Sequence, residues 1–493
     1  MNIKDSQKNS KNYVISKGDT VHFAIPNNTE YYCMAIGVWL CEGINSCADP
    51  GLSSTVLKTQ FEDTNAKIVI CYEGSRKRVY ETLVQSGQLE KTKVIVLEKS
   101  CPDKNEDQPI TEEGFTFVRD FLEDAEKLPQ PPLLQDGTPK DDETHVIFWS
   151  SGTTGLPKGI QHSNHNFRFQ LAGLKKTSGS TSVTTTCFFH GGGFGLFTQL
   201  MASPQTIVFN HGGDIDNDDT CELLYKEVDR FKPIWLMFGS HHFVLMSKQK
   251  PKDTKLDLNS VVFVSPMGST VPQTLYEDLK SSFSNLVTIF SFYGMTEMWQ
   301  VVTYSFDVTQ LGFVGWDVEV KIVDPETEEL LGPNQVGEIM VKPIAVMKGY
   351  LNRPDENKKF FGENGFIHTG DLASYSKNGM LKYEGRQKEL IKYKNHHLYP
   401  LEIENIICTH PDVIEAAVFG RPEPTVQELV TAVVIKAPNS NISEQDIIGL
   451  VESQVDDSRK LRGGVIFAEA LPKNSVGKIQ RKKLIELYEE MQD

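Results

Sequence analysis

A loop rich in hydroxyl groups and glycines follows an apolar run in the first third of the chain. The apolar run is Val146-Ile147-Phe148-Trp149, and the residues after it are Ser150-Ser151-Gly152-Thr153-Thr154-Gly155-Leu156-Pro157-Lys158-Gly159. Glycines let backbone N–H groups turn toward an anion, hydroxyl groups add donors, and a lysine adds a full positive charge. These residue types in this order predict a loop that cradles a polyphosphate.

This segment is not a Walker P-loop. The pattern G-x-x-x-x-G-K-[ST] fails because Pro157 stands five residues after Gly152, and the other glycine–lysine pair, Gly477-Lys478, is followed by Ile479. A P-loop kinase or GTPase is therefore disfavoured. A flexible Ser/Gly linker remains the alternative interpretation of this composition taken alone.

The elements around the loop indicate an α/β fold. Apolar runs of strand length, Thr20 to Ala24, Lys67 to Cys71 and Lys93 to Leu97, alternate with stretches of helical spacing, and the run before the loop predicts a strand buried on both faces. We expect a large layered domain of mixed sheets and helices over residues 1–384. The sequence pattern changes at Gly385. Residues 385–493 predict a small α+β domain that is joined to the large domain through that glycine.

Composition excludes several classes of function. The 493 residues contain 50 Lys and Arg against 66 Asp and Glu, so the formal charge of −16 disfavours nucleic acid as a partner. The eight cysteines form no C-x-x-C pair, which indicates a reducing compartment. The apolar run from Met34 to Cys41 is too short to span a membrane, and the last residues, Met491-Gln492-Asp493, are not the peroxisomal address. We therefore expect a cytoplasmic protein without a membrane span.

Four further motifs follow the loop in order. They are Tyr293-Gly294-Met295-Thr296-Glu297, His368-Thr369-Gly370-Asp371, Gly385-Arg386-Gln387-Lys388-Glu389-Leu390-Ile391-Lys392, and Leu471-Pro472-Lys473 with Gly477-Lys478. Together with the Ser/Gly loop they resemble the signature segments of the AMP-forming adenylating enzymes, which include acyl- and aryl-CoA synthetases, coumarate:CoA ligases and beetle luciferases. The similarity extends from about Gly18 to the end of the chain.

The resemblance implies a reaction in which a carboxylate attacks the α-phosphate of ATP, with Mg²⁺ bound and CoA as the later acceptor. Two anions must then meet, so cations and amides must converge on them. The implied catalytic residues are Thr296, Glu297 and Lys478, with Glu297 also the Mg²⁺ ligand. The implied nucleotide contacts are Ser150, Ser151, Gly152, Thr153, Thr154, Gly155, Lys158, Tyr293, Asp371 and Arg386.

Each of these side chains also has a purely structural interpretation. A glutamate or an arginine is most often solvated, Tyr293 could be ordinary core packing, and Asp371 could form a turn after Gly370. A lysine near the end of a chain, such as Lys478, is normally exposed. The motif context favours the functional interpretation in each case.

The resemblance also implies an acid pocket, a CoA path and a mobile small domain. The pocket residues are His190, Gly192, Phe194, Met267 and Gly268, and the CoA path contains Lys392, Lys394 and Asn395. The bulk of Met267 favours a short or differently shaped acid, and Asn395 stands where the family has a glycine. The small domain would turn about Gly385 between two half-reactions, with Lys478 inward for adenylation.

The sequence therefore predicts an ATP-dependent acid:CoA ligase acting on a fatty or aromatic acid, with two alternatives. One is a luciferin 4-monooxygenase, which the displaced His190 disfavours. The other is a catalytically inactive paralogue that binds ATP or another ligand. The pairs His241-His242 and His396-His397 do not predict a metal site, because adjacent side chains on a helix or strand point apart.

Overall fold

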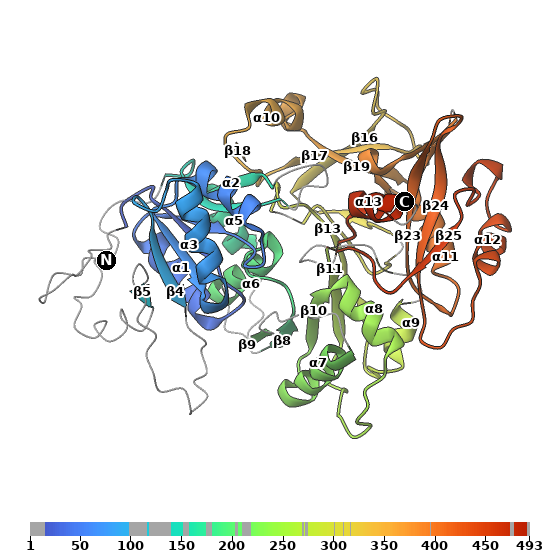
Figure 1. The fold of residues 1–493 in the computed structure, drawn as a ribbon, viewed down its shortest axis with the longest axis horizontal. Helices are drawn as coiled ribbons and strands as arrows, with labels where there is room; N and C mark the ends of the chain where they lie inside the picture. The colour runs from blue at the N-terminus through green and yellow to red at the C-terminus, as the bar shows by residue number, and fades with distance from the viewer. Residues whose placement is uncertain are drawn as a thin grey trace, which may run out of the picture.

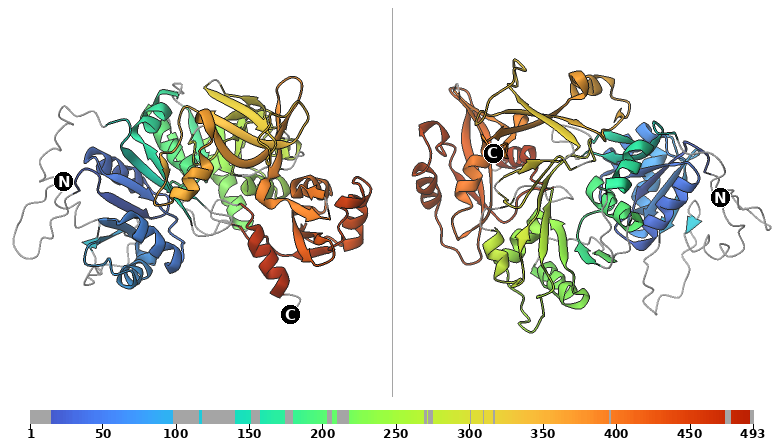
Figure 2. Two further views of the ribbon diagram at one scale, coloured as in Figure 1. Left: turned by 90° about the horizontal axis from the view of Figure 1, so that it is seen from above. Right: turned by 180° about the vertical axis from the view of Figure 1, so that it is seen from behind.

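The computed structural model describes residues 15–97, 116–117, 140–150, 157–173, 180–202, 206–209, 218–268, 271, 275–299, 301–308, 310–315, 317–394, 396–473 and 478–490. Within these ranges the sheets and helices form an α/β fold. Residues 15–97 lie at one end of the molecule and the C-terminal part lies at the other, with antiparallel sheets and further helices between them (Figure 1). Figure 2 shows the same order from above and from behind.

The first sheet has eight strands in the order β18-β7-β6-β2-β1-β3-β4-β5. Its strands are β1 (Thr20–Ala24), β2 (Ile44–Cys47), β3 (Ile68–Tyr72), β4 (Lys93–Leu97), β5 (Thr116–Phe117), β6 (Thr144–Trp149), β7 (Gly159–Ser163) and β18 (Gly349–Tyr350). From β6 to β5 the strands run parallel, whereas β7 and β18 are antiparallel to their neighbours. The predicted strands at β1, β3, β4 and β6 are confirmed.

Helices cover both faces of this sheet. They are α1 (Thr29–Leu40), α2 (Ser54–Thr64), α3 (Arg76–Gln85) and α5 (Asn164–Gly173), with the short 3-10 helix η1 (Glu73–Ser75) before α3. Phe61 of α2 and Leu83 of α3 are fully buried against Val69 and Val96 of β3 and β4. Strand residues buried on both faces explain why β3 and β6 read as continuous apolar runs.

The second sheet is wholly parallel, in the order β12-β11-β10-β8-β9. Its strands are β8 (Thr181–Thr184), β9 (Thr206–Phe209), β10 (Trp235–Gly239), β11 (Phe263–Met267) and β12 (Thr288–Ile289), and its helices are α6 (Gly191–Ala202), α7 (Asp218–Phe231), α8 (Ser240–Lys248) and α9 (Leu275–Lys280). Helices α7, α8 and α9 bury Leu236, Phe238 and Val264 of one face. Ligand sites of parallel sheets form at the carboxyl ends of the strands, which here are Thr184, Gly239 and Met267.

Two antiparallel sheets follow. One contains β13 (Ser291–Tyr293), β14 (Thr303–Ser305) and β15 (Phe313–Val314), and the other contains β16 (Val318–Val323), β17 (Gly337–Pro343), β19 (Ile367–Tyr375) and β20 (Leu381–Arg386). Helix α10 (Pro354–Phe360) and the 3-10 helix η2 (Glu363–Gly365) lie between β18 and β19. The register of β19 and β20 places Asp371 directly opposite Arg386.

The C-terminal part has its own sheet and core. The strands are β21 (Ile391–Tyr393), β22 (His396–Leu398), β23 (Val413–Glu423), β24 (Gln427–Lys436) and β25 (Val465–Ala468), and the helices are η3 (Gln387–Glu389), α11 (Pro400–Ile407), α12 (Glu444–Glu452), η4 (Asp457–Arg459) and α13 (Arg481–Glu490). Ile403, Ile407, Val418 and Val434 are completely buried between α11 and the sheet. Strands β23 and β24 pair as one long hairpin down to Glu423 and Gln427.

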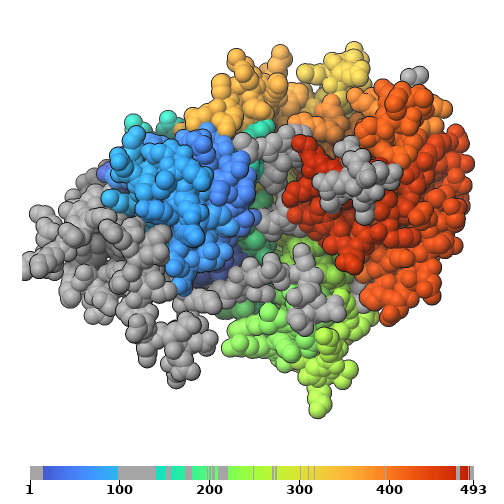
Figure 3. Space-filling view, in the orientation of Figure 1, coloured from blue at the N-terminus to red at the C-terminus, as the bar shows by residue number. Residues whose placement is uncertain are grey.

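The C-terminal part contacts the rest of the molecule through several elements. Helix α8 touches β23, α11 touches β20 and η3 touches β19, and in Figure 3 the orange and red surface lies against the green and the yellow surfaces. None of the helices in the described part of the chain combines the length and the apolar character that crossing a bilayer requires.

Candidate active site

The two ends of the Ser/Gly loop are fastened to each other. The backbone N–H of Ser150 donates to the carbonyl of Lys158 at 3.0 Å, and the N–H of Lys158 donates to the Ser150 hydroxyl at 3.1 Å. These bonds extend the β6–β7 hairpin, in which Trp149 pairs with Gly159. Ser151, Gly152, Thr153, Thr154 and Gly155 lie outside the described residues. The structure therefore places Lys158 at the neck of the predicted phosphate loop.

Glu297 is held in place by a tyrosine that the sequence analysis did not select. The phenol of Tyr350 donates to Glu297 Oε1 at 2.8 Å. Burial raises the pKa of Glu297, and the hydrogen bond from Tyr350 lowers it. The backbone carbonyl of Glu297 also accepts from the N–H of Met347 at 2.7 Å, so both ends of this residue are fixed by the β18 segment.

Thr296 is fixed from the other side by a buried histidine. His162 Nδ1 accepts from the Asn166 amide at 2.8 Å, which leaves Nε2 to donate to the Thr296 carbonyl at 2.7 Å. Burial lowers the pKa of His162 to about 4, in agreement with a neutral ring. Trp299, three residues after Thr296, has a positive φ of 45°, and its indole N–H donates to the carbonyl of Gly191 at 2.9 Å. The Thr296-Glu297 segment is therefore tied to β7 and to the start of α6.

Asp371 is the centre of a second group of predicted residues. The phenol of Tyr293 donates to Asp371 Oδ2 at 2.9 Å, and Arg386 Nε lies 3.0 Å from Oδ1. Tyr383, which the sequence analysis did not select, donates to Oδ1 at 3.4 Å. The exposed fraction of Asp371 is 3% and that of Tyr293 is 8%. Asp371 is thus a paired, buried carboxylate, not the solvated end of a turn.

The C-terminal segment carries Lys478 to this group. Burial and the positive charge of Arg386 lower the pKa of Lys478 from its ordinary value of 10.5 to about 8, against the charges of Asp371 and Glu389, which raise it. The neighbouring backbone is held by the Gln480 N–H, which donates to the carbonyl of Pro472 at 2.8 Å. Lys478 is therefore a half-buried ammonium near Asp371 and Arg386, not a solvated tail residue.

The predicted pocket residues fall into two groups. A side-chain carbon at Gly192 would lie 3.4 Å from Met267 Cε, so the start of α6 faces the carboxyl end of β11, where Gly268 has a φ of +94°. Burial lowers the pKa of His190, which immediately precedes α6. Phe194 is instead completely buried, with ring contacts to Phe148 and Trp299. This placement supports a packing role for Phe194.

The predicted CoA residues lie on the surface of the C-terminal part. Lys392 and Lys394 are exposed, and the ammonium of Lys394 lies 5.1 Å from the centre of the Tyr393 ring. Asn395 lies outside the described residues. Strand pairing places Lys392 opposite His397, so this hairpin offers a basic edge to solvent.

The prediction that adjacent histidines point apart is wrong for His241 and His242. Their ring centres lie 3.8 Å apart. Gly239 leaves room for this arrangement, because a side-chain carbon there would meet the His241 ring at 2.7 Å. The described residues contain no group of three His, Cys, Asp or Glu side chains that could hold a metal ion. Glu297 as a single carboxylate ligand fits Mg²⁺, which also takes waters and phosphate oxygens.

The chain matches the family model of the AMP-binding enzymes over residues 13–351 and the model of their C-terminal domain over residues 402–478. The chain belongs to the AMP-binding enzyme family. It is 30% identical over 431 residues to a luciferin 4-monooxygenase of Nipponoluciola cruciata, covering 82% of this chain and 76% of that protein. It is 27% identical over 486 residues to the peroxisomal OPC-8:0-CoA ligase 1 of Arabidopsis thaliana, covering 96% of this chain and 84% of that protein.

Solved structures confirm the fold of this AMP-binding enzyme. The structure of an anthranilate CoA ligase in complex with anthranoyl-AMP superposes with a TM-score of 0.84 at 20% identity, covering 97% of this chain and 89% of that one. An ATP-bound structure of MatB from Rhodopseudomonas palustris gives a TM-score of 0.81 at 22% identity, covering 97% and 90%.

Replacing Tyr350 with phenylalanine tests the contact to Glu297. The Tyr350→Phe change removes the hydrogen bond that lowers the pKa of Glu297, so this pKa rises further and the carboxylate is protonated at higher pH. We expect the acidic limb of kcat/KM for ATP to move to higher pH, with little loss at pH 8. Tyr375→Phe removes a phenolic hydrogen bond to Leu331 and serves as the matched control. An acidic limb at the same pH in Tyr350→Phe and the wild type would contradict an effect of Tyr350 on the Glu297 carboxylate.

The pKa of Lys478 predicts that adenylate formation slows at alkaline pH. A lysine pKa lowered to about 8 means that the ammonium is lost as pH rises through that value. We expect the rate of adenylate formation to fall about tenfold for each pH unit above 8, measured by single-turnover pyrophosphate release. The Lys478→Arg variant keeps its positive charge at high pH, so its rate of adenylate formation should not fall above pH 8. A wild-type rate that is flat to pH 10 would refute the role of the Lys478 ammonium.

Proposed function

We propose that this protein is an ATP- and Mg²⁺-dependent acid:CoA ligase that forms an acyl-adenylate and then a CoA thioester. The observation that carries the proposal is the contact of Asp371 with Arg386 and Tyr293, residues from three distant motifs, with Lys478 close enough for the charges of Asp371 and Arg386 to act on its pKa. An ammonium, a guanidinium and a carboxylate next to a flat aromatic ring suit a nucleotide whose α-phosphate is to be attacked. The CoA ligases among the relatives and the solved structures support the same reaction.

In the first half-reaction a carboxylate oxygen of the acid attacks the α-phosphorus, and the bond to pyrophosphate breaks. Negative charge accumulates where the two anions meet, and the Lys478 ammonium stabilises it. Asp371 accepts from the two ribose hydroxyls, and Lys158 contacts the outer phosphates. Mg²⁺, when bound by Glu297, supplies charge neutralisation of the leaving pyrophosphate.

The second half-reaction requires a thiol to reach the adenylate. The carbonyl carbon forms a bond to the CoA sulfur, and AMP leaves with the electron pair of the broken C–O bond. Gly385 has a φ of +139° with open space around the position of a side-chain carbon, so it suits a large backbone rotation. We propose that the small domain turns there, which withdraws Lys478 and brings the exposed Lys392 and Lys394 to the site.

An aromatic cluster lies at the amino ends of β10 and β11, on the sheet face that also carries Met267, and we propose that it favours an aromatic acid. Its members are Trp235, Phe263, Phe290, Phe292 and Phe306. The ring centre of Phe290 lies 5.6 Å from the ring centre of Trp235, 5.4 Å from that of Phe263 and 4.9 Å from that of Phe306. The Trp235 indole donates to the Ser265 hydroxyl at 2.9 Å, which joins the cluster to β11 and so to Met267. Offset aromatic pairs add stabilisation beyond their buried area.

The similarity to luciferin 4-monooxygenases supports a second candidate function, in which oxygen reacts with the adenylate. ATP-dependent light emission with beetle luciferin is the observation that would favour it. A folded protein that binds ATP and turns over no acid would instead favour the inactive paralogue.

A panel of carboxylic acids tests the proposed ligase. We expect pyrophosphate release with at least one acid, and thioester formation only when CoA is added. Lys478→Ala should lower adenylate formation by several orders of magnitude, because the charge at the reacting oxygens is lost. The same variant should convert a preformed adenylate and CoA at nearly the wild-type rate. An equal loss in both half-reactions would contradict the turning domain.

Phe290→Leu tests the aromatic preference. The change keeps an apolar side chain of similar size and removes the ring, so KM for aromatic acids should rise by about two- to tenfold, the range of an aromatic pair. KM for straight-chain acids should change little. Phe313→Leu replaces a 45% exposed phenylalanine of β15 and is the control. A rise for both acid classes, or for neither, would refute selection by the cluster.

A further inference from the structure

Tyr350 stands between the lysine of the phosphate loop and the carboxylate assigned to Mg²⁺. Its phenol donates to Glu297 Oε1 at 2.8 Å, and the ammonium of Lys158 lies 5.0 Å from the centre of its ring. A cation at this distance from an aromatic face is attracted by the ring electrons. One side chain therefore contacts both charged groups.

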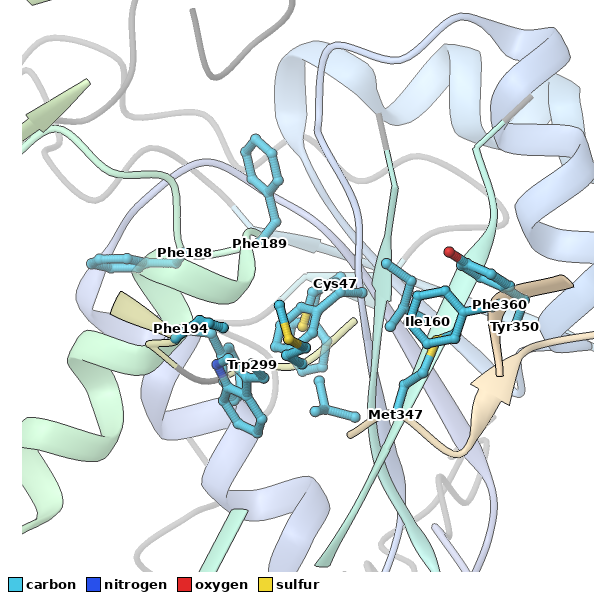
Figure 4. Close-up of a cluster of buried hydrophobic side chains, with 14 of the residues drawn as sticks. Cys47, Ile160, Phe188, Phe189, Phe194, Trp299, Met347, Tyr350 and Phe360 are labelled. Atoms are coloured by element: carbon cyan, nitrogen blue, oxygen red, sulfur yellow. The ribbon is translucent and has the colours of Figure 1, made fainter. Parts of the chain in front are cut away.

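The backbone that carries Tyr350 is fixed by strand pairing. Tyr350 pairs with Ile160, and the Leu351 N–H donates to the carbonyl of Gly159 at 2.7 Å, one residue after Lys158. Tyr350 packs beside Ile160, Met347 and Phe360 in the hydrophobic core (Figure 4). The phenol ring thus has little freedom to leave Lys158.

Helix α10 adds a second clamp. The side chain of Asn357 accepts from the Tyr350 N–H at 2.6 Å and donates to the Tyr350 carbonyl at 3.0 Å. Gly349 leaves room for this amide, because a side-chain carbon there would lie 2.9 Å from Asn357 Nδ2. The same helix carries Glu356, the residue before Asn357.

Glu356 forms an ion pair with Lys158. The hydrogen bond from Lys158 is the main cause that lowers the pKa of Glu356, and the charges of Lys359 and Lys388 act in the same direction. The side chains of Lys158 and Glu356 are 26% and 44% exposed. A partly exposed pair of this kind is weak enough to exchange partners with another anion.

We propose that Glu356 competes with the phosphates of ATP for the ammonium of Lys158 and thereby sets the affinity for ATP. The proposal rests on the proposed use of ATP at this site. The carboxylate is attached to the helix that clamps Tyr350, so it returns to Lys158 whenever the phosphates leave. The Tyr350 ring keeps the Lys158 ammonium at the neck of the loop, whether Glu356 or a phosphate of ATP is its partner.

Glu356→Gln is the test, because it keeps the shape of the side chain and removes its charge. We expect the dissociation constant of ATP, measured by calorimetry, and KM for ATP to fall by about two- to fivefold, the range of a partly exposed ion pair. Because the competition acts on binding, kcat should change less than KM. The gain should shrink as salt is added.

Asp355→Asn is the matched control. Asp355 is the preceding residue of the same helix, its side chain is 89% exposed, and its contact to Lys358 is 4.0 Å long. The Asp355→Asn variant loses the same negative charge at a position away from Lys158, so its ATP affinity should be unchanged. In a Lys158→Met background, Glu356→Gln should have no further effect, since the contested ammonium is gone.

The outcomes separate this proposal from the proposed function. A wild-type protein that binds no ATP would refute the proposed function. A wild-type protein that binds ATP, with Glu356→Gln binding it equally or more weakly, would overturn the competition alone. An equal gain in Asp355→Asn would also overturn it, because a general charge effect would then suffice.

Discussion

The buried carboxylate of Asp371 is the interaction on which the arrangement of the site depends. A charge that is 3% exposed is costly unless partners surround it, and here two phenols and a guanidinium do so. Asp371 lies on β19 and its partners come from β13 and β20, so the carboxylate helps to fix how the two antiparallel sheets meet. The same negative charge helps to keep the Lys478 ammonium protonated within a buried setting.

A second group of polar contacts joins the predicted phosphate loop to the carboxylate that we propose for Mg²⁺. It runs from Glu356 to Lys158, across the Tyr350 ring, to Glu297. His162 and Met347 hold the backbone carbonyls of the Thr296-Glu297 segment. A fixed backbone there gives the Glu297 side chain a fixed position relative to its neighbours.

The sequence pointed to the motif residues but not to the side chains that contact them. Lys158, Glu297, Asp371 and Lys478 could be selected because residue type and spacing within one segment carry that information. The roles of Tyr350 and Tyr383 depend on the register between strands far apart in sequence, and nothing near either residue indicates its partner. The strands β1 and β4 have the bounds of their apolar runs, whereas β23 continues into the polar residues up to Glu423 because it pairs there with β24.

Rules based on neighbouring residues in the sequence did not give the direction of a side chain where tertiary packing determines it. The histidine rings at the start of α8 lie together because Gly239 leaves space for them. Phe194 follows three glycines in a segment predicted to line the pocket, yet tertiary contacts to Phe148 and Trp299 place it inside the core. Such outcomes depend on neighbours that only the folded chain supplies.

Strand β18 has only two residues, and it pairs with β7 across nearly two hundred intervening positions. During synthesis the hairpin behind the phosphate loop emerges long before this strand, so its outer edge stays open until the ribosome has translated past residue 350. Closing so long a loop costs entropy and slows folding. The nascent protein therefore completes its first sheet late, after the whole second sheet has already been made.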